Sequence, residues 1–241
     1  MKIEITNRFS REVILSGEAD SLNALLQLGL EPGQDLSGAD LHATYLAGLN
    51  LSSIGLSGAN LTGANLTRTD LSRSNLSRSN LTRANLTGAL LSNADLAEAN
   101  LTGVDLTIAQ MQGVKLVNAN LYWASLPGAD LTDADLSETN LSKANLTLAI
   151  LVNADLFWTD LADANLTMAN LSGASLTVAN LRRACLARAN LSGATLAASD
   201  LTSADLSDAN LSGCDLTEAA LNGANLTGAD LTNAQMTGAK M

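Results

Sequence analysis

The sequence is poor in the residues that usually build reactive sites. Its 241 residues include one histidine, two cysteines, two prolines and 2 % aromatic residues. His42 has no partner set from which a His/Cys metal cluster or an activated Cys or Ser nucleophile could be assembled. No glycine-rich phosphate loop is present. We therefore expect no enzymatic activity, no metal and no cofactor.

Long apolar runs are also missing. No stretch approaches the roughly 18 apolar residues that a membrane-spanning helix needs. The first residues, Met1 to Ile5, alternate polar and apolar side chains and lack the apolar core of a signal peptide. Cys185 and Cys214 do not have CxxC spacing, so a disulfide is not expected. These features predict a cytoplasmic protein that does not enter membranes.

Positive charge is scarce as well. The formal net charge is −11, and the sequence pI is about 4.3. An acidic surface repels phosphates, which argues against direct nucleic-acid binding. It favours solubility or a basic partner.

What the sequence does contain is one five-residue unit, repeated from Asp35 to Met241. A large apolar residue falls at every fifth position from Leu36 onward, and the only exceptions to leucine are Met111, Met236 and Met241. Alanine usually stands two residues before this centre, and Asn or Asp stands one before it. Ser or Thr usually follows. Asp in the position before the centre accounts for 13 of the 24 acidic residues.

A period of five fits neither a helix nor a flat strand, whose periods are about 3.6 and 2 residues. All centres return to one interior only if the chain turns a corner once per unit. Strand alternation then points the centre and the residue two before it inward, with Ala as the small partner of Leu. The outward residues suit turns. A helical solenoid is the alternative, but these residues are poor helix formers.

The repeat resembles the pentapeptide-repeat family over residues 35–241. The resemblance implies an all-β fold, a right-handed four-sided parallel β-helix with one unit per side and twenty residues per coil. The chain would then make about ten coils, stacked about 4.8 Å apart.

Residues 1–34 do not repeat, and we expect them to form a small α/β cap. Lys2–Thr6 alternates like a strand and could pair with a strand at Glu12–Leu15. Asp20 or Ser21 could cap a short helix that presents Leu22, Leu25 and Leu26 on one face. The end of a solenoid exposes an apolar disc and unpaired strand edges, so this hairpin and helix are predicted to cover it.

Four successive units carry arginine at the same outward position, two residues after the centre: Arg68, Arg73, Arg78 and Arg83. One unit per side would place them on all four sides of one coil. We name this set the arginine collar. It is either solvated surface or a docking site for an acidic partner. Phosphate binding is less favoured, because neither a glycine loop nor a helix N-terminus accompanies the arginines.

Large apolar side chains occupy outward positions between residues 108 and 178. With positions twenty apart stacked, Leu148 and Met168 become neighbours, and Ile108 lies two coils away. An exposed apolar patch usually marks an interaction surface, with Trp and Tyr as favoured anchors. Scattered apolar residues on flat walls are the alternative explanation. The candidate partner-binding residues are Tyr122, Trp123, Leu148, Ile150, Phe157, Trp158, Met168 and Val178.

The inward pattern continues to the last residue, with Leu226, Leu231, Met236 and Met241 as the final centres. An uncovered apolar end favours a two-fold contact between identical ends. Some family members resemble this arrangement, so a homodimer joined at the C-terminal coil is expected. A monomer closed by its own last residues is the alternative.

Two functions follow. The first is a non-catalytic interaction module or scaffold that presents rigid walls to a protein partner. The second comes from the resemblance, because some family members are similar to duplex DNA in width and negative charge and bind type II topoisomerases such as gyrase. The arginine collar interrupts the negatively charged surface that such mimicry requires. The repeats also contain no inserted loops of the kind that some of these members carry.

Overall fold

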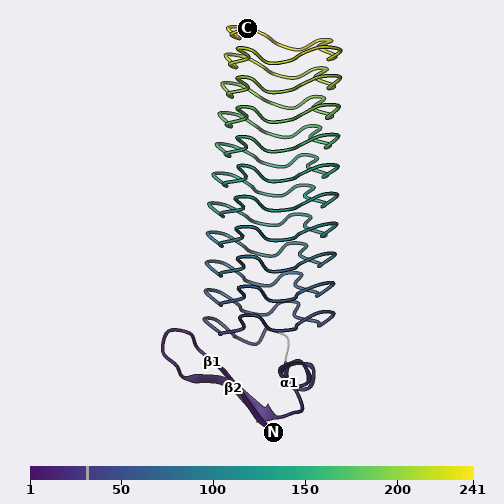
Figure 1. The fold of residues 1–241 in the computed structure, drawn as a ribbon. Helices are drawn as coiled ribbons and strands as arrows, with labels where there is room; N and C mark the ends of the chain where they lie inside the picture. The colour runs from purple at the N-terminus through teal and green to yellow at the C-terminus, as the bar shows by residue number, and fades with distance from the viewer. Residues whose placement is uncertain (31–32) are drawn as a thin grey trace.

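The computed structural model describes residues 1–30 and 33–241, and it shows a rod of stacked coils with a hairpin and a helix at its N-terminal end (Figure 1). Strands β1 (Lys2–Thr6) and β2 (Val13–Glu18) pair antiparallel, with Ile5 opposite Leu15. Helix α1 spans Leu22–Gly29. Ser21 is its N-cap, and the Ser21 hydroxyl accepts a hydrogen bond from the Ala24 amide at 3.1 Å. β2 extends three residues beyond the strand predicted to end at Leu15.

The repeat winds with twenty residues per coil. Each unit forms a single parallel bridge with the unit twenty residues later, from Asp35–Gly55 to Ala220–Lys240. The 207 residues from 35 to 241 therefore make about ten coils of four units. We label the sides by their first centres: side A begins with the Leu36 unit, side B with Leu41, side C with Leu46 and side D with Leu51. Each side repeats every twenty residues.

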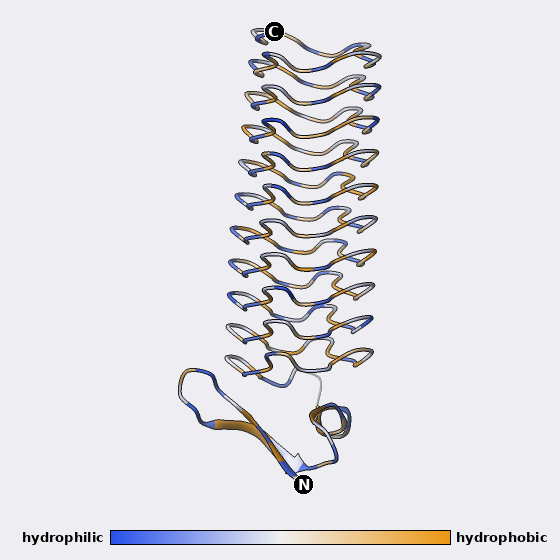
Figure 2. Ribbon diagram, viewed as in Figure 1, coloured by the Kyte–Doolittle hydropathy of each residue, from blue (hydrophilic) through white to orange (hydrophobic). Residues whose placement is uncertain are grey.

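The interior is a set of leucine stacks. Every centre from Leu36 to Leu221, including Met111, is at least 98 % buried. The alanines two residues before the centres are buried as well. Figure 2 shows hydrophobic and hydrophilic residues alternating around each coil. Where Ser or Thr replaces Ala, its hydroxyl bonds to the backbone, as Ser74 Oγ does to the Leu71 carbonyl at 2.6 Å. Cys214 is buried in the same inward position.

Most corners share one chemistry. The side-chain oxygen of the Asn or Asp before the centre accepts hydrogen bonds from the residue after it: Asn60 Oδ1 lies 3.3 Å from the Thr62 amide and 2.7 Å from its hydroxyl. The residue two after the centre adopts a left-handed conformation, whether it is glycine or not. Its amide donates to the next coil, as Gly63 N does to the Thr82 carbonyl at 2.9 Å. The side-chain oxygen and the ladder between coils together provide hydrogen-bond partners for these backbone amides of the corner.

The two ends differ. At the N-terminal end, Asn7 bridges Ala39, and the Arg8 amide donates to the Gly38 carbonyl at 2.7 Å, so the hairpin adds to the first coil. Ile5 and Leu26 are buried against the leucine stacks. At the other end Leu226, Leu231 and Met236 are only partly buried, and Met241 is exposed. No helix in the described part of the chain is long and apolar enough to cross a membrane.

Candidate functional site

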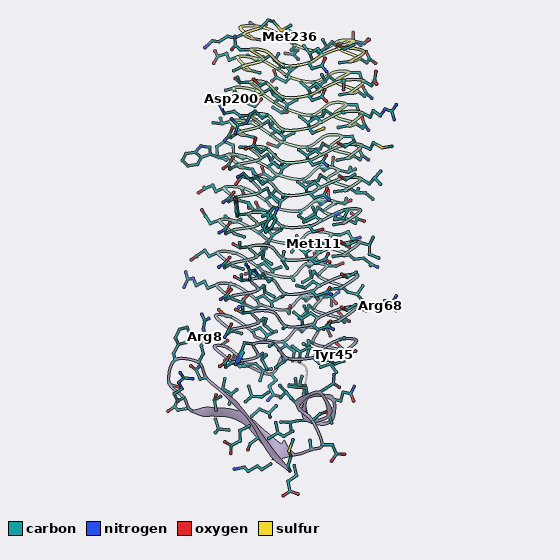
Figure 3. The ribbon with its side chains drawn as sticks, in the orientation of Figure 1. Arg8, Tyr45, Arg68, Met111, Asp200 and Met236 are labelled. Carbon is teal, nitrogen blue, oxygen red and sulfur yellow. The ribbon has the colours of Figure 1, made fainter. Side chains whose placement is uncertain are left out.

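The arginine collar lies as the spacing predicts, with one arginine on each side of one coil: Arg68 on side C, Arg73 on D, Arg78 on A and Arg83 on B. Figure 3 shows Arg68 pointing away from the rod. Arg78 is neutralised, because its Nε and Nη2 donate to the two carboxylate oxygens of Glu98 in the next coil, both at 3.0 Å. The Arg78 guanidinium lowers the pKa of Glu98 through this contact. Within residues 1–30 and 33–241, no ion pair involves the other three collar arginines.

The predicted apolar residues do not form one patch, because they occupy three adjacent sides and one corner. Side C carries Leu148 and Met168 in neighbouring coils, with Ile108 two coils below and Gly128 between. Ile150 lies around the corner toward side D. Leu148 is 55 % exposed and Met168 49 %, so both side chains are available to a partner.

Side A carries Phe157 and Trp158 in one unit and Val178 in the next coil. Trp158 is 62 % exposed. Side B carries Tyr122 and Trp123, and Trp123 is 70 % exposed. On the same side, Lys143 Nζ lies 3.4 Å from the Tyr122 hydroxyl and 5.6 Å from the centre of its ring. The three sides thus present aromatic and aliphatic groups on a rigid backbone.

Most of these side chains stand on left-handed backbone. Ile108 has φ 52°, Trp158 φ 55°, Trp123 φ 58°, and Leu148 and Val178 φ 60°. Each non-glycine residue in this region costs roughly 1–2 kcal/mol, and the strain is greatest for bulky or β-branched side chains. Glycine fills the same position in many other units, including Gly128 beside Ile108. These units therefore expose large apolar side chains on strained backbone.

Three contributors to these surfaces do not follow from the repeat pattern: Tyr45, Lys143 and the collar's glycine neighbours. Tyr45 is 64 % exposed near the collar. Gly88 and Gly103 stand one coil beyond Arg68 and Arg83, where the absent side chains leave shallow hollows. Reading the outward residues in steps of twenty would have revealed both glycines.

Elsewhere the walls are acidic or internally paired. Arg183 donates to both carboxylate oxygens of Asp163 at 2.7 and 2.8 Å, and Arg182 Nη1 lies 3.0 Å from Asp200 Oδ2. Hydroxyl and amide donors from Thr217 hold the pKa of Asp215 below its ordinary value, and Ser207 acts likewise on Asp205. The Asp215 and Asp205 carboxylates accept hydrogen bonds within their own corners, so their positions are explained by the turns they stabilise. Among the described residues, no three His, Cys, Asp or Glu side chains could hold a metal ion.

The coil, the buried centres and the corner chemistry together define the class of protein. The family model for pentapeptide repeats matches in eight copies, in overlapping stretches from 35–78 to 204–241. The chain therefore belongs to the pentapeptide-repeat family, whose members fold as right-handed quadrilateral β-helices. The predicted fold is confirmed. Members are generally non-enzymatic structural or interaction modules.

Solved structures provide further comparisons. HetL, a pentapeptide repeat protein involved in heterocyst differentiation regulation from the cyanobacterium Nostoc sp. strain PCC 7120, is 37 % identical, with 82 % of this chain and 89 % of HetL covered and a TM-score of 0.37. The Nostoc protein alr5209 is 36 % identical, with 40 % of this chain and 83 % of alr5209 covered and a TM-score of 0.35. QnrB1, a plasmid-mediated fluoroquinolone resistance protein, is 22 % identical in one trypsin-treated variant form, with 76 % of this chain and 89 % of QnrB1 covered and a TM-score of 0.42. No curated protein sequence matches the chain.

Proposed function

We propose that this protein is a non-catalytic scaffold whose rigid walls bind a protein partner. The observation that carries the proposal is the set of large apolar side chains held exposed on left-handed backbone between residues 108 and 178. Elsewhere in the repeat this left-handed position carries glycine or mostly polar residues such as Arg, Asn, Asp and Glu, so folding does not require Trp, Leu, Met or Ile there. A wall whose backbone is fixed by the inter-coil ladder also loses little freedom when it binds, which favours affinity.

The partner-binding test compares side C with side D. A double variant, Leu148→Asn with Met168→Asn, removes two neighbouring apolar groups and places in both a residue that tolerates left-handed backbone. The control, Gly193→Asn with Gly213→Asn, places Asn at the same position of the repeat in two neighbouring coils of side D, where an added Cβ meets no atom within 4 Å. Tagged proteins are incubated with a lysate of cells that express the protein, and captured proteins are quantified. The proposal requires a captured protein that the double variant loses and the control retains. Equal capture by all three proteins contradicts binding through side C.

Mimicry of duplex DNA toward a type II topoisomerase is the second candidate. The net charge of −11 on a rod of stacked coils supports it. The three collar arginines without a carboxylate partner oppose it, because they place positive charge on three sides of the rod. A gyrase supercoiling assay separates the candidates. The scaffold proposal expects no change in supercoiling at micromolar protein, whereas inhibition or protection of gyrase would favour mimicry.

A further inference from the structure

The outward column of side B contains a hollow bordered by two cations and an aromatic ring. Its successive residues are Arg83, Gly103, Trp123 and Lys143, one per coil. Because Gly103 has no side chain, a groove of about 400 Å³ opens between Arg83 and Trp123 and extends around the corner toward Ser125. A Cβ added at Gly103 would lie 3.7 Å from Arg83 Cγ, so the arginine stem forms one wall of the hollow.

The groove is lined by the basic side chains of Arg83 and Lys143, although the protein as a whole is acidic. Arg83 joins no ion pair among residues 1–30 and 33–241, whereas Arg78 and Arg183 each hold a carboxylate with two bonds. Lys143 contacts the Tyr122 hydroxyl and ring. Asp163, the next residue of the column, is paired with Arg183 and also attracts Lys143 electrostatically.

One further carboxylate lies near the groove. Asp105 stands at the adjoining corner, and its Oδ1 accepts from the Thr107 amide at 3.0 Å and from the Thr107 hydroxyl at 2.6 Å. These hydrogen bonds hold the Asp105 carboxylate at its own corner. The groove therefore has an arginine without an ion-pair partner among the described residues at one end and a lysine at the other, and an anionic ligand would be complementary to these two cations.

We propose that this groove binds an extended, acidic segment of a protein, with the pattern acid-x-apolar-x-acid. The proposal rests on the scaffold function and names the chemistry of one partner segment. Coils stack about 4.8 Å apart, so Arg83 and Lys143, three coils apart, are separated by about 14 Å along the rod. An extended chain rises about 3.3 Å per residue, and side chains at i, i+2 and i+4 share one face and span about 13 Å. The outer carboxylates then meet Arg83 and Lys143, and the central apolar side chain enters the hollow against Trp123.

Side C offers a partial copy of this arrangement. Arg68, Gly88 and Ile108 follow the same order, and Tyr45 lines their hollow. The position equivalent to Lys143 is Gly128, so the second cation is missing. A segment with two acids should therefore prefer side B.

The test uses two fluorescein-labelled peptides of equal composition and measures fluorescence anisotropy with the full chain. The first contains Glu-Thr-Leu-Thr-Glu, which places both acids on the face of the leucine in an extended chain. The second contains Thr-Glu-Leu-Glu-Thr, which places them on the opposite face. We expect the first peptide to bind about fivefold or more tightly than the second, on the order of one exposed charge pair. Equal affinity, or no binding of the first peptide at millimolar protein, overturns the proposal.

Variants locate the site. Arg83→Asn and Trp123→Asn should each weaken binding of the first peptide about fivefold, since each removes one predicted contact. The matched control, Arg73→Asn on side D, removes the same charge from the same repeat position and should leave the affinity unchanged. A similar loss with Arg73→Asn would mean that only long-range charge acts, which refutes the groove. If Trp123→Asn does not fold, as judged by circular dichroism, Arg83→Asn decides.

Two further results separate this proposal from its alternatives. A labelled single-stranded oligonucleotide that binds more tightly than the peptide, and depends on Arg83, would overturn the assignment of a protein ligand. If lysate capture depends on Leu148 and Met168 but the peptides do not bind, the groove proposal fails and the scaffold function stands.

Discussion

Removing a single leucine from the middle of the rod should be far more damaging than removing an outward side chain of the same coil. Leu141 is completely buried, and its amide donates to the Asp160 carbonyl at 2.7 Å. In the preceding coil, the Leu121 amide donates to the Asn140 backbone carbonyl at the same distance, so both neighbouring coils are held at fixed spacing. Leu141→Ala therefore leaves a cavity that cannot collapse. Buried Leu→Ala changes cost about 3–5 kcal/mol, and sites that relax least lie at the upper end.

The matched control is Thr147→Ala. The Thr147 hydroxyl donates to Asn145 Oδ1 at 2.6 Å in an exposed corner. The hydrogen bond from the backbone amide of residue 147 to the same oxygen remains after the substitution. Its loss should cost about 1 kcal/mol or less. Urea unfolding and thermal melting followed by circular dichroism measure the difference. For a chain of this size we expect Leu141→Ala to lower the melting temperature by about 6–20 °C. A loss within about 1 kcal/mol of the control would refute the inward assignment of the centres.

Three further predictions concern acid, thiols and assembly. Hydrogen bonds from the residue two later hold the pKa of Asp35, Asp205, Asp215 and Asp230 below the ordinary 3.8, so the unfolded chain binds protons first. The stability contributed by these groups should be fully present well above the ordinary value of 3.8 and should be lost as the pH falls through the lower pKa values of the folded state. Between about pH 6 and about pH 3, the double variant Asp205→Asn with Asp215→Asn should lose less unfolding free energy than the wild-type protein does. An equal loss in the two proteins would contradict this. Burial raises the pKa of Cys214 to about 11, whereas Cys185 is only partly buried. Ellman's reagent at about pH 8 should therefore titrate one thiol in the folded protein and two in urea, and two fast thiols without urea would be evidence against the buried site. For the homodimer proposed through the coil of Leu226, Leu231 and Met236, light scattering should give twice the 24.8 kDa chain mass, whereas a single chain mass at high concentration would exclude it.

The sequence predicts the rod better than its surface. The unbroken phase of the centres determines which residues are buried, so the positions of Leu141 or Met111 follow without coordinates. Local chemistry also predicts a helix cap at Asp20 or Ser21, and the structure places it at Ser21. The end of β2 does not, because Ser16, Gly17 and Glu18 have weak strand preference and are held by pairing with β1.

The surface depends on which residues stack, and this becomes readable only once the coil length is known. Steps of twenty place the arginine collar on four sides and Leu148 beside Met168, as predicted. The same step brings Glu98 to Arg78 and Asp163 to Arg183, but side-chain rotamers decide whether such neighbours bond. The hollow at Gly103 arises from an absent side chain between two large ones. A reading of single residues does not show such a feature.

Under the proposed function, the outward apolar residues serve binding and not folding. Trp158→Gly tests it with two readouts on one variant. Trp158 has φ 55°, and Gly58 occupies the same column of side A with φ 64°, so glycine fits this backbone. Relief of about 1–2 kcal/mol of strain opposes the lost packing of a side chain that is 62 % exposed. We expect an unfolding free energy unchanged within about 1 kcal/mol, together with reduced retention of the partner captured by the wild-type protein. A clear loss of stability with unchanged partner retention would contradict it.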